Sequence, residues 1–275
     1  MQSRSNPIYQ VVMGLLFAGA CSNGEILAQA SEIRPVSSRS ESSNNLLTQS
    51  VRSPIAALPL EQLPQLTKQK IQAIIDRPTV RTLGLAEAFN CKPDQYYWLL
   101  DNPQHVVRLW RALGAKVTDV ESHGDGHYSY RDEEGSHVTW DTIIKNDTHR
   151  LWVAEGKIKA GYFIPAISLK AIVAVHHEPG SDMSGNTAMK HQVEMIVQTD
   201  SHAIAFATKL LGASAPHLGE QFVGQIEMFF GAMAWFLDQH PVRAARLLAE
   251  LEQPESRKVA PVKPASFLRS GNSGR

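Results

Sequence analysis

Three polar side chains fall on strand faces that are otherwise apolar, and each could take part in acid–base or hydrogen-bond chemistry. His191 alternates with apolar residues in the segment 187–199, His177 does so in 166–178, and Glu87 lies on the apolar face of an earlier strand. Burying such a group without a partner costs a few kcal/mol, so each requires one. A ligand hydroxyl or carbonyl, or a hydrogen bond within the protein, could supply that partner. A shift of one residue in register would instead turn these groups outward.

Bulky and adaptable side chains accompany these polar groups. Alternation on the strands and helical spacing near the C-terminus bring Met and Trp residues together, and such residues suit an apolar ligand. The predicted lining of a binding cavity comprises Glu87, Trp140, His177, Met189, His191, Met195, Met228, Met233 and Trp235. The same side chains could instead fill a closed core, because a periodic pattern does not reveal a void.

The sequence contains no motif that fixes a reaction, a metal or a cofactor. It lacks the G-x-S-x-G, Walker, G-x-G-x-x-G, H-E-x-x-H and paired C-x-x-C patterns. His123 and His127 flank a turn, and His176 precedes His177, but zinc needs three or four converging ligands and neighbouring strand residues point to opposite faces. We therefore predict no metal site and no cofactor, and we assign no catalytic residue. Cys91 is predicted to be a small buried apolar residue.

The elements that must position these side chains follow from periodicity. Residues 61–77 have helical spacing, 80–90 alternate as a strand, and Pro93 opens a pair of helices that ends at Gly114. Strands with short, turn-rich connections are predicted at 116–123, 127–131, 136–144, 149–158, 166–178 and 187–199. Ala203 to Leu210 form a short helix, and residues 217–239 form a long one with a broad apolar stripe. We expect an α+β fold with a mostly antiparallel sheet.

One stretch of the chain resembles the opening of START and Bet v 1-like domains: LAEAFNCKPDQYYWLLDNPQHVVRLW. It reads as a strand, a turn with Pro and Asp, and an aromatic helix that leads to a Trp. The resemblance covers about 80–240. It implies a helix-grip architecture: a curved antiparallel sheet wrapped on a long C-terminal helix around an apolar cavity, here with an additional N-terminal helix. Members of that superfamily bind lipids, sterols, hormones or polyketides, and a few are cyclases or aromatases.

The two ends of the chain differ in composition from its centre. Residues 1–30 have a positive start, an apolar run of about ten residues and an A-x-A site at Ala28–Ala30, which is typical of a signal peptide cleaved after Ala30. The alternative is a bacterial lipobox that would make Cys21 a lipid anchor. Residues 31–53 are predicted to be a disordered linker, 54–252 a single domain, and 253–275 a disordered basic tail.

Composition narrows the function classes. The chain has 275 residues, with 27 Lys and Arg balanced by 27 Asp and Glu, and 43% of its residues are hydrophobic. This excludes a strongly basic nucleic-acid binder and suits a globular protein. We expect no transmembrane span after signal cleavage, because the apolar run is too short. The predicted location is periplasmic or extracellular, with an outer-membrane-attached lipoprotein as the alternative.

Three functions fit these observations. The favoured one is an exported protein that binds a hydrophobic small molecule or lipid between the sheet and the C-terminal helix. A second is a cyclase- or aromatase-like enzyme whose acid–base groups are His191, His177 or Glu87. A third is a non-catalytic interaction protein of the cell envelope with a filled core. Binding is favoured because acid–base catalysis needs a convergent constellation that the sequence alone does not provide.

Overall fold

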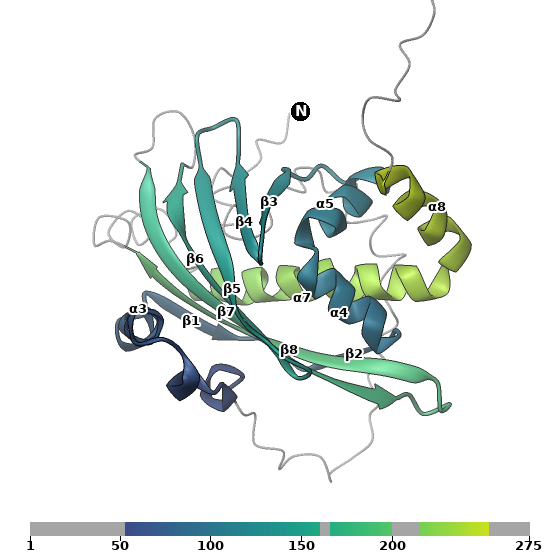
Figure 1. Cartoon of the computed structure of the whole chain (residues 1–275), viewed down its shortest axis with the longest axis horizontal. Coiled ribbons are helices and arrows are strands. Elements are labelled where there is room, and N and C mark those ends of the chain that lie inside the picture. Colours follow the sequence, from purple (N-terminus) through teal and green to yellow (C-terminus); the bar gives the residue numbers. More distant parts are fainter. Residues whose placement is uncertain (1–52, 160–165, 200–214, 253–275) are drawn as a thin grey trace, which may run out of the picture.

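The computed structural model describes residues 53–159, 166–199 and 215–252 (Figure 1). The predicted leader, most of the predicted linker, the short helix at 203–210 and the basic tail lie outside these residues. The described elements, in chain order, are η1 (Ile55–Ala57), η2 (Leu60–Gln62), α3 (Gln65–Asp76), β1 (Val80–Leu83), β2 (Glu87–Asn90), α4 (Pro93–Asp101), α5 (Pro103–Ala112), β3 (Val120–Gly124), β4 (His127–Arg131), β5 (His137–Lys145), β6 (His149–Ile158), β7 (Ile167–Ser181), β8 (Thr187–Thr199), α7 (Ala215–Gln239) and α8 (Pro241–Glu252).

The fold is α+β, and its centre is one curved antiparallel sheet that wraps on α7, as expected for a helix grip (Figure 1). Among the described residues the sheet has eight strands in the order β1-β8-β7-β6-β5-β4-β3, and β2 also pairs with β8. Short turns favour this arrangement, because antiparallel neighbours can be joined by tight connections. None of the described helices is long and apolar enough to cross a membrane.

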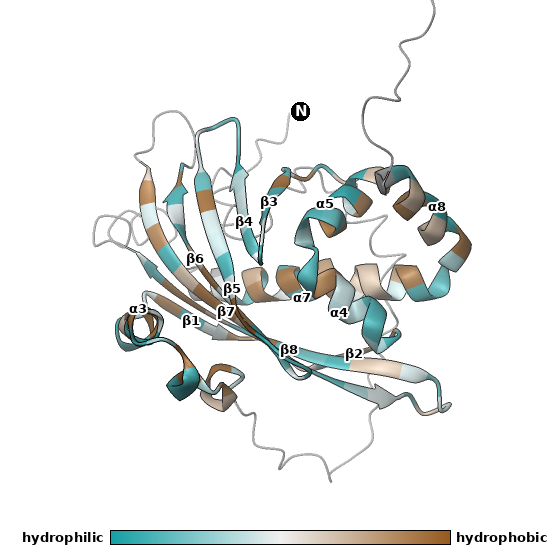
Figure 2. Ribbon diagram, in the orientation of Figure 1, coloured by the Kyte–Doolittle hydropathy of each residue, from teal (hydrophilic) through white to brown (hydrophobic). Residues whose placement is uncertain are grey.

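The inner face of the sheet packs against α4, α5 and α7, and α8 packs on α5 and α7. Alternate residues of each strand point to this face, as period-two spacing requires. On β8 these include Met189, Val193 and Met195, all buried in the main hydrophobic cluster. The ring of Trp152 on β6 stacks on Phe230 of α7, with ring centroids 5.7 Å apart. Figure 2 shows hydrophobic residues concentrated along the middle of the sheet and on α7.

The outer face of the sheet carries a second, smaller hydrophobic cluster beneath α3. Ile71 and Ile74 of this helix are almost completely buried and pack with Ile172 and Ile196 of β7 and β8. This is the additional N-terminal helix expected from the sequence, and it covers the side of the sheet opposite α7 (Figure 1). An eight-stranded sheet that is apolar on both faces at its centre needs a cover on each side.

Glu194 lies on the outer face, as β8 alternation predicts, but it is buried rather than solvated. Its Oε2 accepts hydrogen bonds from Ser53 Oγ at 2.5 Å and from the backbone N–H of Ile55 at 3.1 Å. Its Oε1 lies 2.8 Å from Arg81 Nη2. A buried carboxylate with this many partners is satisfied, and it fastens the segment before α3 to the sheet.

The predicted single strand at 80–90 is wrong, because a bulge divides it into β1 and β2. From Leu83 to Glu87 the chain advances four residues, while its partner β8 advances three, from Glu194 to His191, so one residue is extra. An extra residue reverses which side chains face the core. Leu85 is therefore 81% exposed, although the sequence pattern predicts it to be inside.

Two further predictions needed correction at the ends of elements. The segment 179–182, expected to be loop, continues β7 as far as Ser181. Pro179 is tolerated there because the pairing of β7 with β6 ends at His176. Its missing N–H therefore removes no hydrogen bond to β6. Helix α8 was not predicted as a separate element, although Pro241 stands at its first position, where proline favours a helix start.

Candidate functional site

A row of three polar residues crosses the inner part of the sheet near one end. In register, Glu87 of β2 stands opposite His191 of β8, and His191 stands opposite His177 of β7. Both histidines are buried, at 1% and 0% exposure. Alternation on β7 and β8 predicts this placement for the two histidines. Register also places Glu87 on this face, but its side chain is exposed, with its Oε2 3.8 Å from His191 Nε2. The predicted strand face of Glu87 is confirmed, whereas its predicted burial is wrong.

Tyr96 on α4 supplies the partner for His191. Its hydroxyl lies 2.6 Å from His191 Nδ1, within a fully buried setting. When the hydroxyl donates, the imidazole carries its proton on Nε2, which faces Glu87. Phe89 packs its ring against both Tyr96 and His191, at centroid distances of 5.4 and 4.9 Å. Burial raises the pKa of Tyr96 well above its ordinary value, so its hydroxyl keeps its proton.

His177 is held neutral beside a buried cation. Burial, followed by the positive charge of Arg150, lowers the pKa of His177 to about 3. Arg150 Nη1 lies 3.5 Å from His177 Nε2, and because a guanidinium only donates, Nε2 is the acceptor. The imidazole proton then sits on Nδ1. Within the described residues, both His177 Nδ1 and His191 Nε2 are buried without a hydrogen-bond partner.

Arg150 is fixed by an ion pair that ties α4 to the sheet. Its Nε lies 2.9 Å from Asp101 Oδ1, and its Nη2 lies 3.3 Å from Asp101 Oδ2, a bidentate geometry. Lys145 Nζ lies 2.8 Å from the same carboxylate. The Arg150 side chain is only 5% exposed, so its charge needs this partner. The pair positions both the cation beside His177 and the helix that carries Tyr96.

Glu227 on α7 is a buried carboxyl group near the row. Its Oε1 lies 3.4 Å from the backbone N–H of Val193, in the part of β8 that faces the bulge. Gly84 makes room for it, because a Cβ there would come within 2.0 Å of Glu227 Oε1. Burial, together with the charge of Glu87, raises the pKa of Glu227 to about 8. The group is therefore mostly protonated at neutral pH.

The remaining predicted lining residues divide into two groups. Trp140, Met189, Met195 and Met233 are buried in the main cluster, where their side chains pack with other core residues. Met228 and Trp235 are partly exposed, and Trp235 contacts the ring of His240 rather than the polar row.

Sequence reasoning missed Tyr96, Arg150 and Glu227. Each lies on an element that was predicted, but its role depends on contacts between elements. Tyr96 meets a residue 95 positions away, and Glu227 meets one 34 positions away. For Arg150, one signal in the sequence could have indicated a buried charge that needs a partner: it stands at the start of a strand whose next residues are apolar.

The described residues contain one cysteine, which is buried, and no cluster of potential metal ligands. Across the described parts of the chain, no three His, Cys, Asp or Glu side chains converge in a way that could hold a metal ion. Cys91, at the start of the turn into α4, is fully buried, as predicted. Burial raises the pKa of its thiol to about 12, so the nucleophilic thiolate is scarce.

Comparisons with known proteins are distant. No protein-family profile matches the sequence, and no curated protein matches it. Among solved structures, a conserved protein from Geobacillus kaustophilus is 14% identical with a TM-score of 0.35, covering 53% of this chain and 91% of that one. Norcoclaurine synthase from Thalictrum flavum is 13% identical with a TM-score of 0.30, covering 54% and 87%. At this level of similarity, the matches say nothing about what the chain binds.

Proposed function

We propose that this chain is an exported protein that binds an apolar small molecule or lipid between the sheet and α7, and that a carbonyl or carboxylate of the ligand is held by His177 and His191. One observation carries the proposal: the two imidazoles stand opposite each other on β7 and β8, each buried, each with one nitrogen that lacks a hydrogen-bond partner among the described residues.

The polar end of the ligand follows from the protonation of the two rings. His177 carries its proton on Nδ1, because Nε2 accepts from Arg150. His191 carries its proton on Nε2 when Tyr96 donates to Nδ1. Two buried N–H groups then lack an acceptor among the described residues, and a buried donor without an acceptor costs about 1–3 kcal/mol. A ligand oxygen with free lone pairs offsets that cost, whereas a pure hydrocarbon does not.

The apolar end of the ligand would rest among the methionines of the main cluster. Met189 and Met195 lie on the same strand face as His191, and Met233 approaches from α7. Unbranched thioether side chains rearrange at low cost, so they can admit an alkyl or ring system where branched residues could not. The helix-grip fold and the START and Bet v 1-like resemblance support the same location, between sheet and helix.

Native mass spectrometry tests this function. Protein purified gently from its own host is expected to carry an apolar molecule that is lost on denaturation, and a mature mass that begins after Ala30. Apo protein is expected to take up dodecanoate and to leave dodecane unbound. A clean apo mass together with no saturable uptake of dodecanoate overturns the proposal.

Paired histidine variants test the polar row. His177→Phe and His191→Phe are expected to weaken dodecanoate binding at least about tenfold, since each removes a donor to a charged group. His176→Phe is the matched control, because His176 is the next residue on β7 and contacts His149 on the other face. Equal binding by all three variants would place the ligand elsewhere.

A second candidate is an acid–base enzyme on the same scaffold. The observation that favours it is the chain from Glu87 Oε2 to His191 Nε2, at 3.8 Å, and from His191 Nδ1 to Tyr96, at 2.6 Å. Such a chain can move a proton between solvent and a buried group. Its test is exchange of the α protons of ethyl acetoacetate in D2O, followed by NMR. Catalysed exchange that Glu87→Gln abolishes would favour the enzyme, and exchange at the uncatalysed rate would exclude this substrate class.

A further inference from the structure

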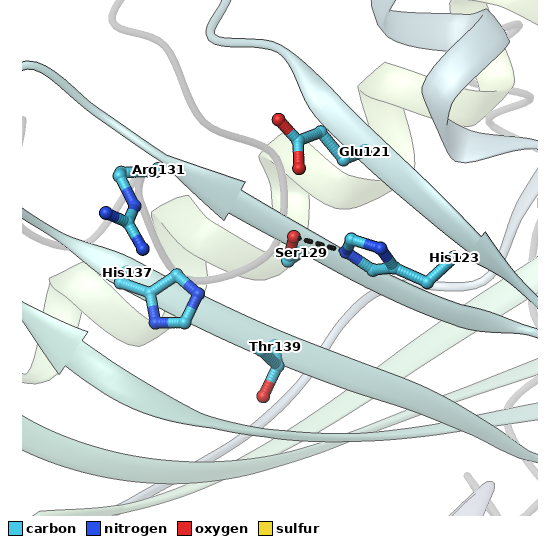
Figure 3. Close-up of a pocket in the computed structure, with 6 residues that line it drawn as sticks. All are labelled: Glu121, His123, Ser129, Arg131, His137 and Thr139. Carbon is cyan, nitrogen blue, oxygen red and sulfur yellow. Dashed lines mark hydrogen bonds between the residues drawn. The ribbon is translucent and has the colours of Figure 1, made fainter.

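The outer face of the sheet carries a polar pocket far from the row of histidines. The pocket has a volume of about 350 Å³ and lies over β3, β4 and β5, where α3 does not cover the sheet (Figure 3). Its lining consists of Glu121, His123, Ser129, Arg131, His137 and Thr139. Alternation explains the set, because the intervening residues, such as Tyr130 and Val138, belong to the inner cluster.

Ser129 is the centre of this pocket. Register places Glu121 on one side of it and Thr139 on the other. Its hydroxyl lies 2.7 Å from His123 Nε2, and the residue is only 8% exposed (Figure 3). A hydroxyl that is fixed by one imidazole and is open on the pocket side can still bond to a ligand oxygen.

Arg131 and His137 form a second, directly opposed pair at one end of the pocket. Figure 3 shows the guanidinium and the imidazole side by side. Among the described residues, neither side chain has an ion pair or a hydrogen bond from its charged or polar group. A guanidinium with all five donors available matches the oxygens of a phosphate or carboxylate in a bidentate way.

Glu121 is the single carboxylate in the lining. Its negative charge repels any bound anion that lacks an O–H donor, because like charges repel at close range. It can, however, accept a hydrogen bond from a P–OH group or from a hydroxyl next to a phosphate. Sulfate has neither, so this carboxylate is a means of discrimination between two oxyanions of similar size and shape.

We propose that this pocket binds a phosphate group, free or on a small monoester, with Arg131 and Ser129 holding its oxygens and Glu121 accepting its proton. His137 and Thr139 complete the set of donors around the group. The site is independent of the proposed ligand between sheet and helix, because it lies on the opposite face of the sheet.

Calorimetric titration of the full chain at constant ionic strength tests the proposal. Inorganic phosphate, glycerol 3-phosphate and sulfate are the three probes, and the first two separate free phosphate from a monoester. Saturable binding of at least one phosphate probe, with sulfate weaker by about tenfold or more, is the expected result. Absence of saturation with both phosphate probes overturns the site.

Three variants locate the binding. Arg131→Gln is expected to weaken phosphate binding at least about tenfold. Lys157→Gln is the matched control, because Lys157 is exposed on the same face, opposite His137, but does not line the pocket; a change of less than about twofold is expected. Glu121→Gln is expected to bring sulfate and phosphate to similar affinities. Equal losses in Arg131→Gln and Lys157→Gln would show only general charge attraction and overturn the proposal.

Discussion

The hydrogen bond between Tyr96 and His191 is a buried contact between α4 and the polar row. Tyr96→Phe leaves His191 Nδ1 buried without a partner, and the free energy of unfolding should fall by about 1–3 kcal/mol. Urea denaturation measures the change. Tyr97→Phe is the control, because that hydroxyl is exposed and donates only a long bond of 3.4 Å to the carbonyl of Asp147; its effect should be within about 0.5 kcal/mol. Equal losses would contradict the assignment.

Glu227 gives stability a pH dependence of definite sign. Its pKa is 4.5 in the unfolded chain and about 8 in the fold, so the folded state binds more protons between these values. The contribution to stability is complete below about pH 4.5 and is lost as the pH rises through 8. Glu227→Gln removes this pH dependence. From pH 5 to pH 9, the free energy of unfolding of the variant should therefore rise by a few kcal/mol relative to that of the wild type. Denaturant curves at both pH values check this, and parallel stabilities would refute it.

His177 acts in the opposite direction. Its pKa falls from 6.5 to about 3 on folding, so the unfolded chain binds more protons in this window. The stability that depends on the neutral ring is complete above pH 6.5 and is lost as the pH falls toward 3. His177→Phe should therefore be less sensitive to acid than the wild type, as measured by the midpoint of acid unfolding. The control His176→Phe should keep the wild-type midpoint.

At the scale of elements, Ile71 and Ile74 are the buried side chains through which α3 packs on the outer face. Ile74→Ala should lower the free energy of unfolding by about 2–5 kcal/mol, because the side chain is completely buried against β7 and β8. Leu66→Ala, on the same helix but 81% exposed, should change it by no more than about 0.5 kcal/mol. Thermal unfolding followed by circular dichroism compares the two variants.

The sequence predicts the strands from β4 onward well, because each has one strongly alternating segment between turn residues. It predicts the burial of His177 and His191 for the same reason. It fails at the bulge between β1 and β2, which places Leu83 opposite Glu194 on the outer face while Glu87 stands opposite His191 on the inner face. The bulge is a property of the pairing with β8, and the alternation within 80–90 does not reveal it. Arg150 and Tyr96 escape prediction because their partners are distant in the chain.

At the scale of the whole molecule, the two hydrophobic clusters share the same strands. Ile172 and Ile196 belong to the outer cluster, while their neighbours Val173 and Met195 belong to the inner one. Unfolding should therefore be a single transition. Tryptophan fluorescence, which reports Trp140 and Trp152 inside, and far-ultraviolet circular dichroism should give coincident curves, and Ile74→Ala should shift both equally. Separate midpoints would show that α3 and its cluster unfold on their own.

The burial of Cys91 makes the rate of thiol labelling a measure of local opening of the fold. The thiol is fully enclosed where β2 turns into α4, and its pKa of about 12 leaves almost no thiolate. A thiol-specific reagent can react only when the structure around Cys91 opens. The labelling rate therefore reports how often the Sγ atom of Cys91 becomes accessible. The chain has one other cysteine, Cys21, and replacing it by Ser leaves Cys91 as the single thiol that can be labelled. Slower labelling in the presence of dodecanoate would then report ligand binding without a signal from the ligand itself.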